Sequence, residues 1–316
     1  MSNILIICDN DKNYCKKLDS YIRANLSIPF EIYGITEVER LQSFKEKGKN
    51  ILLLISQAIF ESTNLLGFEH ILVLREKERS LEEEEADYGN KEADIRYTDK
   101  YQKSERITDN ILSMCLDIPG IVVKGKRTDK GKRMKVTGFY TPTRNSDQTK
   151  GAIAYTKNLS SKERTLYLNT DPLCIHKIIR NETYEENIID LMYFAECSEE
   201  KFGIYLKRIV KHDDGMSFVP ASNSICQSRM ITAKEYGRLI EQIDATGDYD
   251  NLVIDISEGV CDLFEIINLC DDLFMLLEDD YDAHLRTELF LNELKRDDNF
   301  DMNKLHRVSR IGGPEL

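Results

Sequence analysis

The chain has no tryptophan, only six prolines among its 316 residues, and no apolar run that approaches the length of a membrane-spanning helix. A spanning helix needs about 20 mostly apolar residues, so the sequence predicts no transmembrane segment. General disorder is also excluded, because prolines are few and 41% of the residues are hydrophobic. The N-terminal segment lacks the basic leader and cleavage site of a signal peptide, so we expect a cytoplasmic protein.

Closely spaced metal ligands and paired thiols are missing as well. The eight cysteines occur singly, without a C-x-x-C motif, and the five histidines are equally dispersed. Zinc sites and redox-active thiol pairs need clustered side chains, so neither is expected. The cysteines are instead predicted to be reduced and mostly buried, as is typical of a reducing compartment.

The charge is acidic overall but basic at one place. Asp and Glu outnumber Lys and Arg by 56 to 43, which gives a net charge of −13 and argues against nucleic acid as a partner. Residues 124–135 nevertheless hold seven Lys and Arg with two glycines. We interpret this stretch as a linker or boundary loop. A contact with anionic lipid or nucleic acid is the alternative.

The chain length suits two domains of roughly 100–200 residues each. The predicted organisation is a first domain over residues 1–118, a boundary loop over 119–134 and a second domain over 135–316. In the first domain, residues 3–8, 51–56 and 70–75 are short apolar runs, typical of strands buried on both faces of a parallel sheet. Helical patterns lie between them, so a doubly wound α/β domain is predicted.

The second half repeats this alternation. Strands are predicted at residues 135–140, 165–169, 251–255 and 272–277. A polar loop and a helix over about residues 149–159 follow the first of these strands, and a long helical region follows the second. The fold class is therefore α/β with two doubly wound domains.

Polar residues at the predicted strand ends of the first half resemble those of a two-component receiver domain. Asp9 and Asp11 match the acidic pair that would hold Mg²⁺, and Lys100 matches the lysine after the fifth strand. Ser56 stands where the resemblance requires the phosphorylated Asp, and a serine cannot form an acyl phosphate. The resemblance therefore implies a receiver-like, flavodoxin-like domain that serves for docking, a pseudo-receiver.

The second half resembles the MinD/ParA group of P-loop ATPases, and most closely the CpaE-like proteins, over roughly residues 133–300. The group has a loop of pattern K-G-G-x-G-K-[ST]-[ST] between a strand and a helix, whose amides and lysines bind phosphates. At the signature positions this chain has Thr143, Arg144, Asn145, Asp147, Gln148 and Thr149. Only Thr149 keeps the Mg²⁺-ligand hydroxyl, so binding of ATP and Mg²⁺ is disfavoured. Asp147 is expected to add a repulsive carboxylate near the phosphates.

Two acids match further positions of the group. Asp171 corresponds to the residue that orients the attacking water, and Asp255 to the aspartate that holds Mg²⁺ through water. Both also lie at or just after the carboxyl end of a predicted strand, where an aspartate commonly caps the next turn or helix. A nucleotide site and a structural cap thus stay open for each.

The resemblances imply a scaffold or localisation factor with little or no catalysis, like the CpaE-like proteins of Tad/Flp pilus assembly or secretion. Its partners would be proteins of the pilus or secretion machinery, a paralogous ATPase or a second copy of the chain. Through such partners it would be held at the inner face of the membrane. One alternative is an ATP-hydrolysing MinD/ParA-type switch that uses Arg144, Thr149, Asp171 and Asp255. The other is a nucleic-acid-associated regulator that uses residues 124–135.

Overall fold

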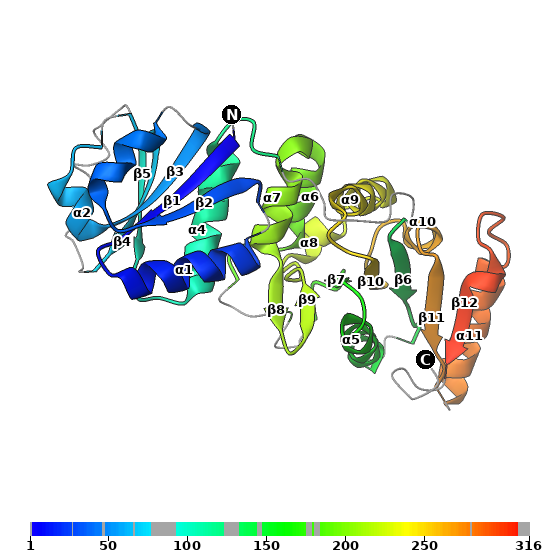
Figure 1. Cartoon of the computed structure of the whole chain (residues 1–316). Helices are drawn as coiled ribbons and strands as arrows, with labels where there is room; N and C mark the ends of the chain where they lie inside the picture. Colours follow the sequence, from blue (N-terminus) through cyan, green and yellow to red (C-terminus); the bar gives the residue numbers. More distant parts are fainter. Residues whose placement is uncertain are drawn as a thin grey trace. The chain divides into compact units, whose positions relative to one another are not determined.

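A computed structural model of the chain is shown in Figure 1. The structure describes residues 2–308 except 27, 46–47, 66, 77–92, 123–132, 144–146, 175–178, 180–183 and 279. Arg144, Asn145 and most of the basic stretch 124–135 therefore lie outside the described residues. The chain divides into two compact units, Met1–Val123 (unit 1) and Lys124–Leu316 (unit 2).

Unit 1 is built on a five-stranded parallel sheet. Its elements are β1 (Ser2–Cys8), α1 (Lys12–Asn25), β2 (Phe30–Ile35), the 3-10 helix η1 (Val38–Phe44), β3 (Gly48–Ser56), α2 (Gln57–Ser62), β4 (His70–Arg75), β5 (Asp94–Asp99) and α4 (Ser104–Asp117). The strand order is β2-β1-β3-β4-β5, and every neighbouring pair is parallel. This is one of the two common orders of doubly wound α/β domains.

The three apolar runs form the centre of this sheet, as predicted. They lie in β1, β3 and β4, whose side chains are buried on both faces. The sequence patterns missed β2 and β5, which lie at the two edges of the sheet and are only partly buried. An edge strand needs no continuous apolar run, because one of its sides faces solvent.

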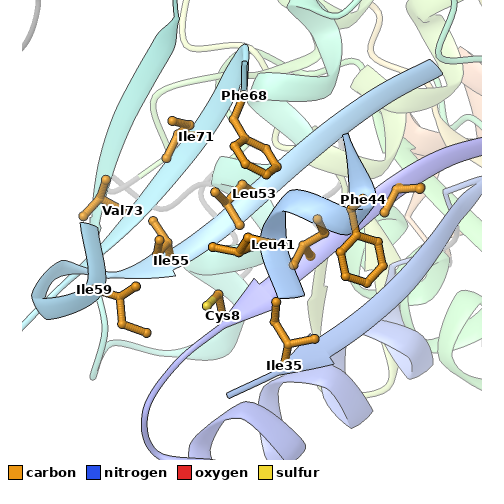
Figure 2. Packing of buried hydrophobic residues seen from close by; sticks show 12 residues of the cluster. Cys8, Ile35, Leu41, Phe44, Leu53, Ile55, Ile59, Phe68, Ile71 and Val73 are labelled. Carbon is orange, nitrogen blue, oxygen red and sulfur yellow. The ribbon is translucent and has the colours of Figure 1, made fainter. Parts of the chain in front are cut away.

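One face of the sheet packs against η1 and α2. Figure 2 shows Leu53 and Ile55 of β3 beside Val73 of β4, with Leu41 of η1 and Ile59 of α2 against them. These residues are at most 2% exposed. Successive strand residues point to opposite faces, so the remaining apolar strand residues lie on the other face of the sheet. Because all the strands are parallel, their carboxyl ends lie at one edge.

Unit 2 is built on a seven-stranded sheet. Its elements are β6 (Lys135–Phe139), α5 (Asp147–Ser160), β7 (Thr165–Asn169), α6 (Ile188–Cys197), α7 (Glu199–Ile209), β8 (Lys211–Asp213), β9 (Met216–Phe218), α8 (Ile225–Ser228), α9 (Ala233–Thr246), β10 (Asn251–Asp255), α10 (Leu263–Asn268), β11 (Asp272–Leu276), α11 (Tyr281–Leu294), η2 (Met302–Lys304) and β12 (Leu305–Val308). The strand order is β12-β11-β6-β10-β7-β9-β8, parallel except for the β8–β9 pair.

The four strands predicted for this half are confirmed as β6, β7, β10 and β11, which occupy the middle of the sheet. The helix predicted after the polar loop is confirmed as α5. The predicted long helical region is wrong in part, because the hairpin of β8 and β9 interrupts it. These strands have three residues each, too short to show a periodic pattern.

Gly138 in β6 lies very close to the segments that follow β10 and precede β11. A Cβ at this position would lie 2.7 Å from Sγ of Cys270 and 3.1 Å from Cδ1 of Ile256. We expect Gly138→Ala to lower the free energy of unfolding by about 1–3 kcal/mol, because the buried neighbours must move. Urea denaturation followed by far-UV circular dichroism measures this change.

Gly237 in α9 offers a matched control. A Cβ there meets only Cδ2 of Leu269, at 3.7 Å. Gly237→Ala is therefore expected to raise the free energy of unfolding by about 0.5–1 kcal/mol through helix propensity. Equal stability of the two variants would contradict the close approach at β6.

Candidate functional sites

The first candidate site lies where β6, β10 and β7 end together in unit 2. The register places Asp255 of β10 beside Phe139 of β6 on one side and Asn169 of β7 on the other. Helix α5 follows β6 and packs on the sheet through Ala152 and Ile153. This packing holds the first turn of α5 against the end of β10.

Gln148 stands where the P-loop resemblance requires the phosphate-binding lysine. It lies in the first turn of α5, is buried, and turns its amide inward. Its Nε2 donates to Oδ1 of Asp255 at 2.5 Å, to the carbonyl of Phe139 at 3.2 Å and to the carbonyl of Ile256 at 3.0 Å. An amide nitrogen has only two hydrogens, so these acceptors use its full donor capacity.

Asp255 is 2% exposed and is surrounded by neutral donors. Its Oδ2 accepts from the hydroxyl of Tyr167 at 2.9 Å and from Nδ2 of Asn169 at 2.9 Å. The Thr149 hydroxyl also hydrogen-bonds to it. Burial raises the pKa of Asp255, an effect that hydrogen bonds from Thr149 and Gln148 partly oppose. No lysine or arginine of the described ranges forms an ion pair with this carboxylate.

Asp171 belongs to the turn that follows β7. Its backbone amide donates to Oδ1 of Asn169 at 2.7 Å, and its Oδ1 accepts from the amide of Leu173 at 2.9 Å. The preceding residue, Thr170, connects this turn to β10, because its hydroxyl donates to the backbone carbonyl of Asp255 at 3.2 Å. Asp171 therefore caps a turn, as one of the two interpretations from the sequence allows.

Asp147, which the sequence predicts to place a carboxylate near the phosphates, lies at the start of α5. Its side chain is exposed and pairs with Nζ of Lys150 at 2.6 Å. The residue begins α5, and an acidic group in the first helical turn interacts favourably with the helix dipole. Asp147 is thus explained by the helix end and needs no phosphate.

The structure brings together Gln148, Thr149 and Asp255, three of the predicted site residues that lie within the described ranges. The sequence analysis missed Tyr167 and gave no role to Asn169. The sequence did contain a signal for both residues. Tyr167 and Asn169 are two residues apart on the strand 165–169, so their side chains share a face, and this strand and the strand 251–255 end at the same edge of the sheet. The two polar side chains could therefore have been placed beside Asp255.

These groups fit a self-contained hydrogen-bonded network better than a triphosphate with Mg²⁺. The amide of Gln148 is neutral and is used on internal acceptors, and both oxygens of Asp255 accept hydrogen bonds. Only the contact of Thr149 with Asp255 suits a magnesium site. No cluster of three metal-ligating side chains occurs in the part of the chain that the structure describes.

The second candidate site lies at the carboxyl edge of the unit 1 sheet. Lys100, 4% exposed, follows β5 and points its ammonium across the edge. Its Nζ lies 2.8 Å from Oδ2 of Asp9, which follows β1, and 2.7 Å from Oε1 of Glu76, which follows β4. Since β3 lies between β1 and β4, the ammonium spans the end of β3, where Ser56 stands.

The electrostatics of this cluster favour the charged lysine. Burial alone would lower the pKa of Lys100, but hydrogen bonds to Asp9 and Glu76 outweigh it and raise the pKa. Tyr14 donates its hydroxyl to the Lys100 carbonyl at 2.8 Å and offers its ring face to the ammonium. The sequence did not point to Tyr14 as a member of the cluster.

Asp11 and Ser56 have structural positions beside the cluster. Asp11 is the N-cap of α1 and accepts from the backbone amides of Asn13 and Tyr14. Ser56 is the N-cap residue of α2, is 1% exposed, and has no hydrogen-bond partner for its hydroxyl among the described atoms. A Mg²⁺ role for Asp9 and Asp11 stays a prediction.

No helix among the described residues is long and apolar enough to cross a membrane. No protein-family model matches the chain, and no curated protein matches it.

The chain is similar to several solved structures. One is a ParA family ATPase from Chlorobium tepidum TLS, with 16% identity, a TM-score of 0.45 and coverage of 56% of this chain and 73% of that chain. Another is cobyrinic acid a,c-diamide synthase from Mycobacterium smegmatis with an ATP analogue and magnesium, with 18% identity, a TM-score of 0.44 and coverage of 55% and 72%. A third is the ATP complex of a McdA variant from Cyanothece, with 16% identity, a TM-score of 0.40 and coverage of 54% and 67%. A ParA family ATPase and an ATP-bound McdA are thus among the structural neighbours of this chain.

Proposed function

We propose that unit 2 is a MinD/ParA-type P-loop domain that no longer hydrolyses ATP and serves as an assembly or localisation scaffold for protein partners. The observation that carries this proposal is the network around Asp255. The residue in the place of the phosphate-binding lysine, Gln148, is neutral and turned inward onto Asp255. A P-loop lysine neutralises phosphate charge, whereas this amide stabilises the domain itself.

Unit 1 would supply a docking surface as a pseudo-receiver. Its strand order is the flavodoxin-like one, and Lys100 is engaged by Asp9 and Glu76, with Ser56 at the end of the intervening strand. The combination with unit 2 supports a CpaE-like role in Tad/Flp pilus assembly or secretion. The partners would then be components of that machinery or a paralogous ATPase.

Calorimetric titration of the full chain with ATP, with and without Mg²⁺, tests the proposal. We expect no saturable heat up to about 1 mM ATP, because both signature lysines of the loop are replaced and the Asp255 oxygens accept internal hydrogen bonds. Saturable binding in the micromolar range would contradict the scaffold proposal. ADP and GTP titrations under the same conditions test whether the result extends to other nucleotides.

An ATP-binding switch of the MinD/ParA type is the second candidate. Two observations favour it: Thr149 contacts Asp255, as in a magnesium site, and Asp147 pairs with Lys150 rather than facing a phosphate. This candidate requires micromolar ATP binding that Thr149→Ala weakens only when Mg²⁺ is present. It also requires ATP-dependent dimerisation and hydrolysis that Asp171→Ala abolishes.

A further inference from the structure

Helix α11 of unit 2 carries an apolar stripe on its solvent side. Tyr281, Leu285 and Leu289 are 80%, 51% and 60% exposed, respectively. They stand four residues apart, so they form a row along one face of the helix. Exposed apolar side chains occur singly on most protein surfaces, whereas a continuous row indicates a contact.

The opposite face fixes this helix to the domain. Ala283, Thr287, Leu291 and Leu294 are buried. The ring of Phe290 packs against Tyr140 and stacks on Phe264. Figure 1 shows α11, in orange, as a regular helix of unit 2. The stripe is therefore presented by a well-anchored element.

Charged groups flank the stripe in a self-complementary pattern. On one side of it lie Asp282 and Arg286, and on the other side lie His284 and Glu288. All four are exposed, and none forms an ion pair with any residue in the described part of the chain. Each side thus has an acidic group and a basic group four residues apart.

We propose that this face of α11 binds the same face of a second copy of the chain, with the two helices antiparallel about Leu285. In that arrangement equal flanks of the two helices meet, so Asp282 lies opposite the partner's Arg286 and His284 opposite the partner's Glu288. Tyr281 packs on the partner's Leu289, and Leu285 packs on its own copy at the two-fold axis. An isologous interface requires such self-complementarity, and one face of α11 provides all of it.

This interface goes beyond the proposed function and does not involve the nucleotide-site residues. Gln148, Thr149 and Asp255 belong to α5 and β10, whereas the interface uses only α11. Dimerisation through α11 would therefore persist without ATP. Failure of one proposal leaves the other standing.

Sedimentation velocity of the full chain without nucleotide, over about 1–100 µM, tests the interface. We expect a monomer–dimer equilibrium whose dissociation constant Leu285→Asp raises at least about tenfold. Met230→Asp is the matched control, since Met230 is 76% exposed outside α11, and it should leave the equilibrium unchanged. A chain that stays monomeric, or a dimer that tolerates Leu285→Asp, would overturn the proposal.

Charge reversal tests the antiparallel pairing. Arg286→Asp places a carboxylate against the partner's Asp282 and should weaken the dimer, and adding Asp282→Arg should restore it. Far-UV circular dichroism checks that each variant is folded. A double variant that folds but does not recover would contradict this pairing.

Cross-linking gives a second readout, because a disulfide traps the dimer covalently. In a chain with Cys197→Ser, Cys226→Ser and Cys261→Ser, the substitution Leu285→Cys should form an intermolecular disulfide on mild oxidation. Met230→Cys in the same background should not. Equal cross-linking at the two positions would mean that the contact at residue 285 is not specific.

Discussion

Lys100→Met is expected to lower the free energy of unfolding of unit 1 by about 3–5 kcal/mol. The substitution removes the only cation that faces Asp9 among the described residues, and Asp9 is 1% exposed. An unpaired carboxylate in that position is strongly unfavourable, because neither water nor a positive charge compensates its burial. Glu76 loses its ion pair at the same time, but it is partly exposed and contributes less.

The double variant Lys100→Met with Asp9→Asn is the control. It removes the cation and the buried charge together, so it should recover much of the lost stability. Urea denaturation followed by far-UV circular dichroism gives the free energy, and hydrogen exchange of β1 and β3 amides assigns the loss to unit 1. A loss below about 1 kcal/mol for Lys100→Met would contradict a structural role of the cluster.

The pH dependence of this contribution has a defined sign. Because the pKa of Lys100 is raised in the folded state, the stability it gives is fully present below the unfolded value of 10.5. It is lost only as the pH rises through the raised folded value. Measurements near neutral pH therefore report the whole effect of the ion pair.

The sequence predicted the centre of both sheets because central strands are buried on both faces. Apolar runs at β1, β3 and β4 need no knowledge of the tertiary structure to be recognised. The edge strands β2 and β5 depend on pairing with neighbours that are distant in sequence. The strands of the β8–β9 hairpin are very short. Their local patterns carry too little information to identify them.

For the candidate site, the positions of the side chains could be predicted from the sequence, but their directions could not. The resemblance to P-loop ATPases identified Gln148 and Asp255, whereas the inward turn of the Gln148 amide depends on carbonyls of β6 and of the segment after β10. The direction of the Asp147 side chain also could not be predicted from the sequence. It pairs with Lys150 at the surface, three residues further along α5, because helix geometry places these two side chains side by side.

Asp255→Ala is expected to lower the free energy of unfolding of unit 2 by about 3 kcal/mol. The carboxylate accepts hydrogen bonds from the side chains of Gln148, Tyr167 and Asn169, which are all buried. Each donor left without a partner costs about 1–3 kcal/mol, although some keep second acceptors. Nδ2 of Asn169, for example, still donates to the hydroxyl of Tyr167.

The direction of this change separates a structural residue from a metal ligand. A carboxylate kept only to hold Mg²⁺ is buried at a cost in stability, so its removal should stabilise the domain or leave it unchanged. Asp171→Ala is the control from the adjacent turn, where loss of a single cap should cost about 1 kcal/mol. Urea denaturation of both variants gives the comparison. A stabilised Asp255→Ala variant would contradict the scaffold proposal and favour the ATP-binding switch.

Asp255→Asn refines the test through its pH dependence. Burial raises the pKa of Asp255 above the ordinary value of 3.8, so above that pH the unfolded chain loses this proton more readily than the folded chain. The free energy of unfolding of the wild type therefore falls as the pH rises, because the folded state favours the protonated form of Asp255. The asparagine variant has no proton to lose at this position, so its free energy of unfolding does not show this fall. We expect the stability of Asp255→Asn relative to the wild type to increase as the pH rises above 3.8. A relative stability that decreases over this range would mean that the hydrogen bonds donated to the ionised carboxylate outweigh the effect of its burial.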